Sequence, residues 1–439
     1  MGAERLPGAM MANGGIGFLL FYKIAIEILY YHYVAHGPWW WGAPYDASFD
    51  ITEYWVSWCV SLIILFICRS TWEKPLNKYH CSEFILLMLL LISVLPGMAM
   101  CGVGAFPSSF SCLYYAYWLF FFFVVRGLVY GKTRLLGFVG QLSHKMRGRL
   151  LFVIGIIVVS TVVFVFIYYN GGNFFVAGIQ STEIYTVRLQ FREIVMPVLV
   201  NYVMANASII LLLLLMFLLQ QKRYELVGVI CLVQYMNFSC GASKLILLSM
   251  LLVLLVYAFR DYITARKIIG IGILIVIAAT VEVYFWKGVF LPSFINRISF
   301  LPAYLNYCYY DYFQVHASVF DLLLGEPIID NRAVNFIIGQ KYFGQPLMSA
   351  NNGFLGDAVR IFGDGGVIIH PILWCIYLYF LDWVSNGIDW RMKFGVSIYW
   401  AVVMQDSFIT TSLFTHGGLA LMGMVYLVNR RRKDVTVTT

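Results

Sequence analysis

The chain of 439 residues is 61% hydrophobic and only 12% charged, and its mean hydropathy is +0.79. A soluble domain carries about 25% charged residues, so the composition excludes a water-soluble enzyme and predicts an all-α, polytopic membrane protein. The formal charge of +8 does not indicate a nucleic-acid partner, because the basic residues do not gather on one soluble face. The nine cysteines lie singly, without the spacing of a zinc site or a disulfide framework.

Apolar stretches of about 20 residues are long enough to cross a bilayer as helices. We expect twelve such spans in a single integral membrane domain that covers residues 1–439. The start of the chain lacks the pattern of a cleavable signal, so the first span is expected to be retained. In chain order the predicted spans are 15–36, 52–68, 82–101, 110–130, 150–169, 197–220, 224–239, 243–259, 267–286, 365–382, 393–410 and 411–429.

Basic residues predict the orientation of these spans. Twenty of the thirty Lys and Arg residues fall in every second connection or in the C-terminal tail, and cytoplasmic loops hold Lys and Arg in excess. We therefore expect both termini in the cytoplasm and loops 170–196 and 287–364 on the outer face. Loop 287–364, between the ninth and tenth spans, is too long for a simple connection. We expect it to cap the bundle, with its aromatic stretch 301–320 along the membrane interface.

Four cations on the predicted outer face are candidates for binding an anion. Arg188 and Arg192 are four residues apart and share one helical face, which suits either an anion clamp or an ordinary interfacial pair. Lys244 begins a very apolar helix on the side where basic residues are rare, and this position favours an anion nearby. Arg297 is the fourth candidate and lies in the predicted external loop 287–364.

A polar stretch at 349–366 precedes the tenth predicted span. Asn351 and Asn352 are followed by a glycine, a sequence typical of a tight turn. Asp357 and Arg360 are three residues apart. They form either an ion pair along one helix or, together with the asparagines, a polar platform that suits a sugar.

Two residues of the aromatic stretch are candidates for a general base. Asp311 and His316 are five residues apart, and an unperturbed histidine titrates near neutrality, although a lone interfacial histidine is more often a polar anchor. Asp46, Asp50 and Glu53 are a weaker candidate for a carboxylate site with a metal, because neither a histidine nor a fixed spacing accompanies them. On balance we expect no metal. The usual nucleotide-binding and hydrolase motifs are absent from the sequence, so no cofactor is expected.

Three stretches together resemble the Wzy family of O-antigen and capsular oligosaccharide repeat-unit polymerases. They are Gly-Ala-Ser-Lys at 241–244, RISFLPAYLNYCYYDYF at 297–313 and SANNGFLGDAVRIFGDGGVIIHPIL at 349–373. The likeness covers mainly residues 240–372. Relatives often place Arg where this chain has Lys244, which keeps the charge but loses the bidentate fork of a guanidinium.

The resemblance implies a GT-C-like glycosyltransferase at the outer, periplasmic face of the bacterial cytoplasmic membrane. Its donor would be a glycan on undecaprenyl diphosphate, its acceptor a lipid-linked repeat unit supplied by a flippase, and a chain-length co-polymerase is a further expected partner. The diphosphate is a good leaving group, so no metal is required. An O-antigen ligase of lipopolysaccharide synthesis and a lipid-linked oligosaccharide flippase or other transporter are the alternatives.

Under this hypothesis the cations bind the diphosphate, and Arg297 takes a catalytic part as the glycosidic bond breaks. The polar stretch would hold sugar, and His316, or failing it Asp311, would take the proton of the attacking hydroxyl. The diphosphate would be bound by Arg188, Arg192, Lys244 and Arg297, and the sugar by Asn351, Asn352, Asp357 and Arg360.

Overall fold

The computed structural model describes residues 14–37, 45, 47–72, 74–130, 143–175, 183–259, 262–288, 290–323 and 332–429. All regular secondary structure within these ranges is helical. This confirms the all-α fold class that the composition predicts. Of the residues singled out in the sequence, Asp46 lies outside the described ranges.

The first part of the chain forms helices that begin at polar caps and continue through apolar runs. Asp50, for example, caps its helix by accepting the N–H groups of Thr52 and Glu53 over 2.7 and 3.0 Å. The elements are α2 (Gly14–Leu29), η1 (Tyr30–Val34), α3 (Ile51–Ile67), α4 (Arg69–Trp72), η2 (Leu76–Lys78), α5 (Cys81–Leu89), η3 (Leu90–Val94), α6 (Leu95–Gly102) and α7 (Ser108–Tyr130).

The middle of the chain contains four long helices and one short amphipathic helix, α9. The elements are α8 (His144–Tyr168), α9 (Glu183–Glu193), α10 (Val198–Gln220), α11 (Tyr224–Gly241) and α12 (Lys244–Ala258).

The last part of the chain contains the predicted external loop and the helices that follow it. The elements are α13 (Ala265–Trp286), α14 (Phe290–Ile295), η5 (Asn296–Phe300), α15 (Leu301–Phe313), α16 (Val319–Leu323), α17 (Val334–Phe343), α18 (Phe354–Phe362), η6 (Gly363–Gly365), α19 (Gly366–Ser385), α20 (Trp390–Asp406), η7 (Thr411–Thr415) and α21 (Gly418–Val428).

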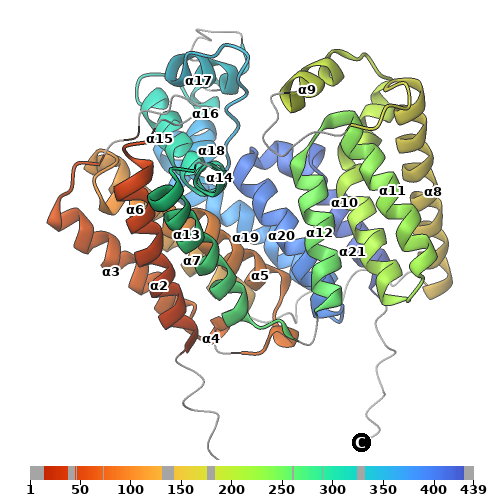
Figure 1. Ribbon diagram of the computed structural model, residues 1–439, viewed down its shortest axis with the longest axis horizontal. Helices are drawn as coiled ribbons and strands as arrows, with labels where there is room; N and C mark the ends of the chain where they lie inside the picture. Colours follow the sequence, from red (N-terminus) through yellow and green to blue (C-terminus); the bar gives the residue numbers. More distant parts are fainter. Residues whose placement is uncertain are drawn as a thin grey trace, which may run out of the picture.

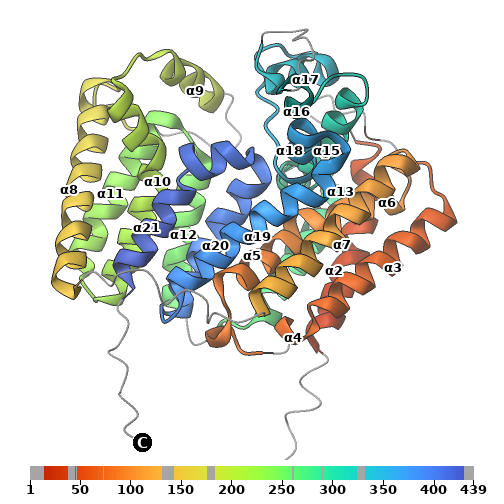
Figure 2. The same cartoon turned by 180° about the vertical axis from the view of Figure 1, so that it is seen from behind.

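The helices form two groups joined by α19 and α20 (Figures 1 and 2). One group contains α2 to α7 with α13 to α18, and the other contains α8 to α12 with α21. α19 packs on α7 and α18, while α20 packs on α5 of the first group and on α10 and α12 of the second. Elements from the end of the chain therefore form the centre of the bundle.

One end of the bundle carries α14 to α18, and we call it the cap end. α4 and η2 lie at the opposite end, as do the start of α2 and the end of α21 (Figure 1). We call this opposite end the basic end, because Arg69 and Lys78 belong to α4 and η2 and Lys74 lies between these two elements.

Within the described residues, six helices are long and apolar enough to cross a membrane, and the chain is therefore a multi-pass α-helical membrane protein. A helix lies in each of the twelve ranges predicted from the sequence, but twelve crossings remain a prediction. The six are Cys81–Gly102, Ser108–Gly127, Lys145–Tyr168, Val198–Gln220, Ala265–Trp286 and Phe354–Ser385.

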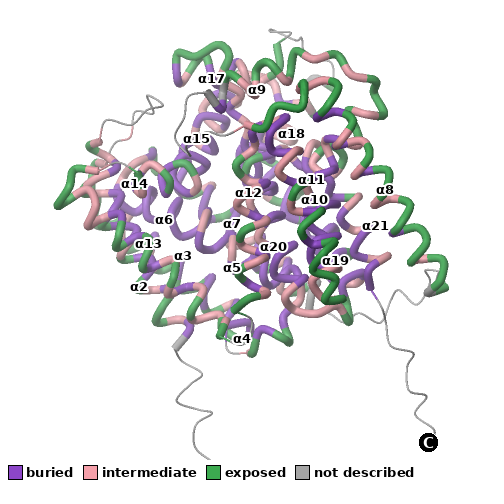
Figure 3. The backbone as a smooth tube through the Cα atoms, turned by 45° about the vertical axis from the view of Figure 1, so that its right-hand side comes forward, coloured by how far each residue is buried: buried purple, intermediate pink, exposed green. Residues whose placement is uncertain are grey.

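Burial divides the spanning helices into inner and outer ones (Figure 3). The rod formed by α5, η3 and α6 is buried almost throughout, whereas α8 exposes apolar side chains such as Phe152 (68% exposed). α13 likewise exposes Leu274 (65%). Apolar surfaces of this kind are stable in contact with lipid tails but not with water.

The aromatic stretch does not lie along an interface with one face exposed, which corrects the prediction. Its first thirteen residues form α15, which packs on α18, and nine of them are buried. Aromatic and small apolar residues surround this helix, so it packs on all sides rather than on one. The buried residues are Leu301, Pro302, Ala303, Tyr304, Leu305, Asn306, Cys308, Tyr309 and Tyr312.

A buried ion pair lies inside α2. Nζ of Lys23 contacts Oε1 of Glu27, and the Lys23 ammonium also lies 4.3 Å from the centre of the Trp58 ring. Lys23 is fully buried and Glu27 is 6% exposed. The two opposite charges therefore neutralise each other within the bundle.

We expect Lys23→Met to lower the free energy of unfolding by about 3 to 5 kcal/mol, because Glu27 would be left as an unpaired buried charge. The double variant Lys23→Met/Glu27→Met should recover most of this loss. Thermal unfolding in detergent measures both effects, with Lys145→Met on the exposed face of α8 as the control. A single variant as stable as the wild type would contradict the prediction.

Candidate functional site at the cap end

The 351–353 turn precedes α18, and its buried asparagine joins two helices. Asn352 is 1% exposed, and its Nδ2 donates to Oδ1 of Asn306 on α15 over 2.9 Å. The same oxygen accepts the N–H of Gly356 over 2.7 Å. Asn352 thus anchors α18 to α15, while Asn351 is half-buried and is the more accessible of the two predicted amides.

The end of α20 links this turn to η5. The N–H of Gly353 donates to the carbonyl oxygen of Gln405 over 2.8 Å. A Cβ at Gly353 would lie 2.0 Å from the carbonyl oxygen of Met404, so a larger residue does not fit there. The side chain of Gln405 in turn donates to the carbonyl oxygen of Ile298 over 2.5 Å.

Asp357 and Arg360 form the ion pair that their spacing predicts as one of two alternatives. Nε and Nη2 of Arg360 donate to Oδ1 of Asp357 over 2.9 and 2.7 Å. Oδ2 of Asp357, which is fully buried, accepts the N–H of Ile409 over 2.6 Å. The Arg360 guanidinium lies 4.0 Å from the centre of the Phe408 ring, and its side chain is 16% exposed. Asp357 therefore fixes Arg360 so that only its edge is accessible.

Two further residues extend this pair into the bundle, and the sequence analysis did not single them out. Nε2 of His370 on α19 lies 3.4 Å from Oδ2 of Asp357. Nδ1 of His370 lies 2.8 Å from the hydroxyl of Tyr117 on α7. All three side chains are buried. A histidine within an apolar run is itself a signal for a polar partner, and this signal could have identified His370.

Three of the four predicted anion-binding cations lie near one another, and we call Arg188, Lys244 and Arg297 the cation group. They come from α9, α12 and η5. Nε and Nη2 of Arg188 donate to the carbonyl oxygen of Ala242 over 3.2 and 3.0 Å, which ties α9 to the turn before Lys244. Lys244 is close enough to Arg188 and Arg297 for both charges to repel its own. An anion would relieve this repulsion.

Arg192 and Asp406 are two further charged residues on helices of this region, α9 and α20. Arg192 is exposed at the end of α9. Asp406 is the last residue of α20 and is exposed. The positive charge of Arg297 acts on its carboxylate. Sequence analysis missed Asp406, although an acid inside a predicted apolar span is a signal that could have found it.

The two predicted bases have other partners. Oδ2 of Asp311 accepts the hydroxyl of Tyr342 over 2.5 Å and lies 3.9 Å from Nζ of Lys341. Burial and this contact raise the pKa of Tyr342 above its usual value, so the phenol remains a donor. His316 stacks on Tyr312 with ring centres 3.9 Å apart, and its Nδ1 lies 2.8 Å from the Tyr312 carbonyl oxygen.

Helix geometry separates these bases from the cation group. η5 and α15 follow each other without a break, and a helix rises about 1.5 Å per residue. Asp311 therefore lies about 20 Å from Arg297 along the continuous helix formed by η5 and α15. His316 comes after the end of α15. Neither side chain shares a reacting centre with Arg297.

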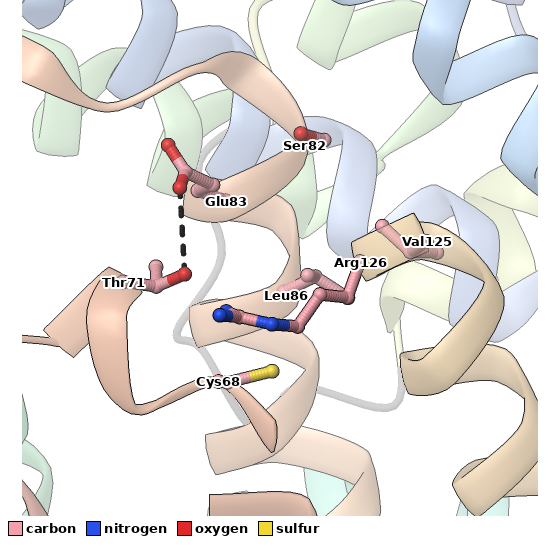
Figure 4. A pocket seen from close by; sticks show the side chains of 7 residues that line it. All are labelled: Cys68, Thr71, Ser82, Glu83, Leu86, Val125 and Arg126. Carbon is pink, nitrogen blue, oxygen red and sulfur yellow. Dashed lines mark hydrogen bonds between the residues drawn. The ribbon is translucent and has the colours of Figure 1, made fainter. Parts of the chain in front are cut away.

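A small pocket lies near α4 and the start of α5, away from the cap (Figure 4). Its volume is about 10 Å³, close to the space that one water molecule needs. Glu83 accepts a hydrogen bond from Thr71 over 3.4 Å beside it and pairs with Lys74. The lining residues are Cys68, Thr71, Ser82, Glu83, Leu86, Val125 and Arg126.

Comparison with protein-family models, with curated proteins and with solved structures finds no match to this chain.

Proposed function

We propose that the protein is a membrane glycosyltransferase that polymerises undecaprenyl-diphosphate-linked oligosaccharide repeat units. The reaction comes from the resemblance to the Wzy family, and the cap end would face the periplasm. The observation that carries the proposal is the cation group, because the positive charges of Arg188 and Arg297 both act on Lys244, and an anion bound beside the three would be attracted by all of them. A diphosphate attached to a lipid combines such an anion with a tail suited to the apolar helices.

The polar residues of the cap support a sugar site next to this anion site. Arg360 is held by Asp357 with its edge accessible, and the half-buried Asn351 lies in the turn before α18. The end of α20 connects this turn to η5, which carries Arg297. A lipid-linked saccharide would then bind with its diphosphate at the cation group and its sugars toward Asn351 and Arg360.

The chemistry requires little beyond alignment and charge stabilisation. The acceptor hydroxyl attacks the anomeric carbon as the bond to the diphosphate breaks, and the configuration at that carbon inverts. Cations fixed in advance stabilise the charge that develops on the leaving group. The remaining requirement is a group that takes the hydroxyl proton.

The proposal is tested with the purified chain in liposomes that contain EDTA. The substrate is the lipid-linked repeat unit extracted from a source strain that lacks this gene. We expect a ladder of lipid-linked oligomers, resolved by size, with release of undecaprenyl diphosphate. Transfer of glycan to lipid A core instead would indicate a ligase. Movement of the intact lipid between leaflets without a ladder would indicate a transporter, and either result would overturn the proposal.

A further inference from the structure

Residues 405–409, which begin in the last turn of α20, contact the turn before α18, η5 and the Asp357–Arg360 pair. Gln405 binds the turn at Gly353 through its carbonyl and binds η5 through its side chain. Further along, the ring of Phe408 lies under the Arg360 guanidinium, and the N–H of Ile409 donates to Asp357. The segment thus lies between the proposed diphosphate site and the proposed sugar site.

Asp406 is the acidic residue of this segment. Its neighbour Gln405 binds the carbonyl of Ile298, the residue after Arg297, and the charge of Arg297 acts on the Asp406 carboxylate. Asp406 is exposed, in contrast to Gln405 and Ser407 on either side of it. An exposed carboxylate is able to accept a proton from a bound hydroxyl.

Two other acids of the cap end, Asp357 and Asp311, are less suited to this role. Both oxygens of the buried Asp357 have partners, Arg360 on one and the N–H of Ile409 on the other. Asp311 accepts the hydroxyl of Tyr342 and lies about 20 Å along the helix from Arg297. The position of Asp406 beside Arg297 has neither disadvantage.

We infer that Asp406 is the general base of the glycosyl transfer, in place of His316 and Asp311. The inference rests on the proposed function. The acceptor hydroxyl oxygen forms the new bond to the anomeric carbon, and its proton passes to the Asp406 carboxylate. The bond from the anomeric carbon to the phosphate oxygen breaks, and its electron pair leaves with the lipid diphosphate, whose charge the cation group stabilises. The proton then passes from Asp406 to water.

The test compares Asp406→Asn with the wild type in the liposome assay, because asparagine keeps the size but cannot take the proton. We expect kcat to fall at least about 100-fold, within the range that general-base catalysis contributes, while KM changes less than about threefold. Glu225→Gln, at an exposed acid in the first turn of α11, is the control and should keep full activity.

The outcomes separate this inference from the proposed function. Without a ladder from the wild type, the proposed function fails, and the inference fails with it. If the wild type and Asp406→Asn make ladders at the same rate, only the inference fails. If Asp406→Asn loses activity only because KM rises, or only because the protein is less stable to heat, Asp406 is a structural partner of Arg297. Either result would also overturn the inference.

A second variant covers the case in which Asp406→Asn does not fold. Asp406→Glu keeps the charge beside Arg297 but moves the carboxylate by one methylene. A general base loses rate on this change because proton transfer depends on its position, whereas a simple counter-charge does not. A variant as fast as the wild type would overturn the inference.

Discussion

Replacement of Arg297 by alanine is expected to lower kcat for repeat-unit polymerisation about 1,000-fold, the upper range for removal of one charge-stabilising donor. Arg297 lies in η5, where its charge acts on both Lys244 and Asp406. Its loss would leave the developing charge of the diphosphate with weaker stabilisation. Arg297→Lys keeps the charge but loses the planar fork, so a smaller loss of about tenfold is expected.

The control for Arg297 is another arginine of the cap. Arg332 lies just before α17 and contacts Oε1 of Gln340 in that helix, and Arg332→Ala should keep the wild-type rate. The liposome assay gives kcat and KM for each variant, and thermal unfolding in detergent shows that the variant is folded. An Arg297→Ala variant with the wild-type kcat would remove Arg297 from the reaction, and with it the main support for the cation group.

Hydropathy predicts the helices well because the length of an apolar run is a local property. The run Val198–Gln220, for instance, is a single helix within two residues of the predicted range 197–220. The burial of α15 was not predictable in this way. Its sequence has aromatic residues on most faces, and only the partners around it, such as α18, decide whether these faces contact lipid or protein.

The candidate site was predictable where its partners are close in sequence. The spacing of Asp357 and Arg360 predicts their ion pair, because residues three apart meet on a helix. Tyr117 and His370 are 253 residues apart, and no local pattern connects them. The same holds for Asp406 and Arg297. The first pair is found only when the fold brings α19 next to α7, and the second only when it brings the end of α20 next to η5.

Replacement of Asp357 by alanine is expected to lower the free energy of unfolding by about 3 to 5 kcal/mol, the cost of breaking a buried ion pair. The change leaves the mostly buried Arg360 guanidinium without its bidentate acceptor and the N–H of Ile409 without a partner. Asp357→Asn should cost less, because the amide oxygen still accepts one of these hydrogen bonds. Thermal unfolding in detergent measures both variants.

The double variant Asp357→Ala/Arg360→Met separates the ion pair from the other contacts of Asp357. Removal of both charges should restore about half of the lost stability or more, since the buried guanidinium is the costlier of the two groups left behind. The hydrogen bond to Ile409 and the contact with His370 remain lost. If the double variant is no more stable than Asp357→Ala, Asp357 stabilises the fold through its contacts with Ile409 and His370 and not through its pairing with Arg360. In that case Arg360 is oriented mainly by its stacking on Phe408.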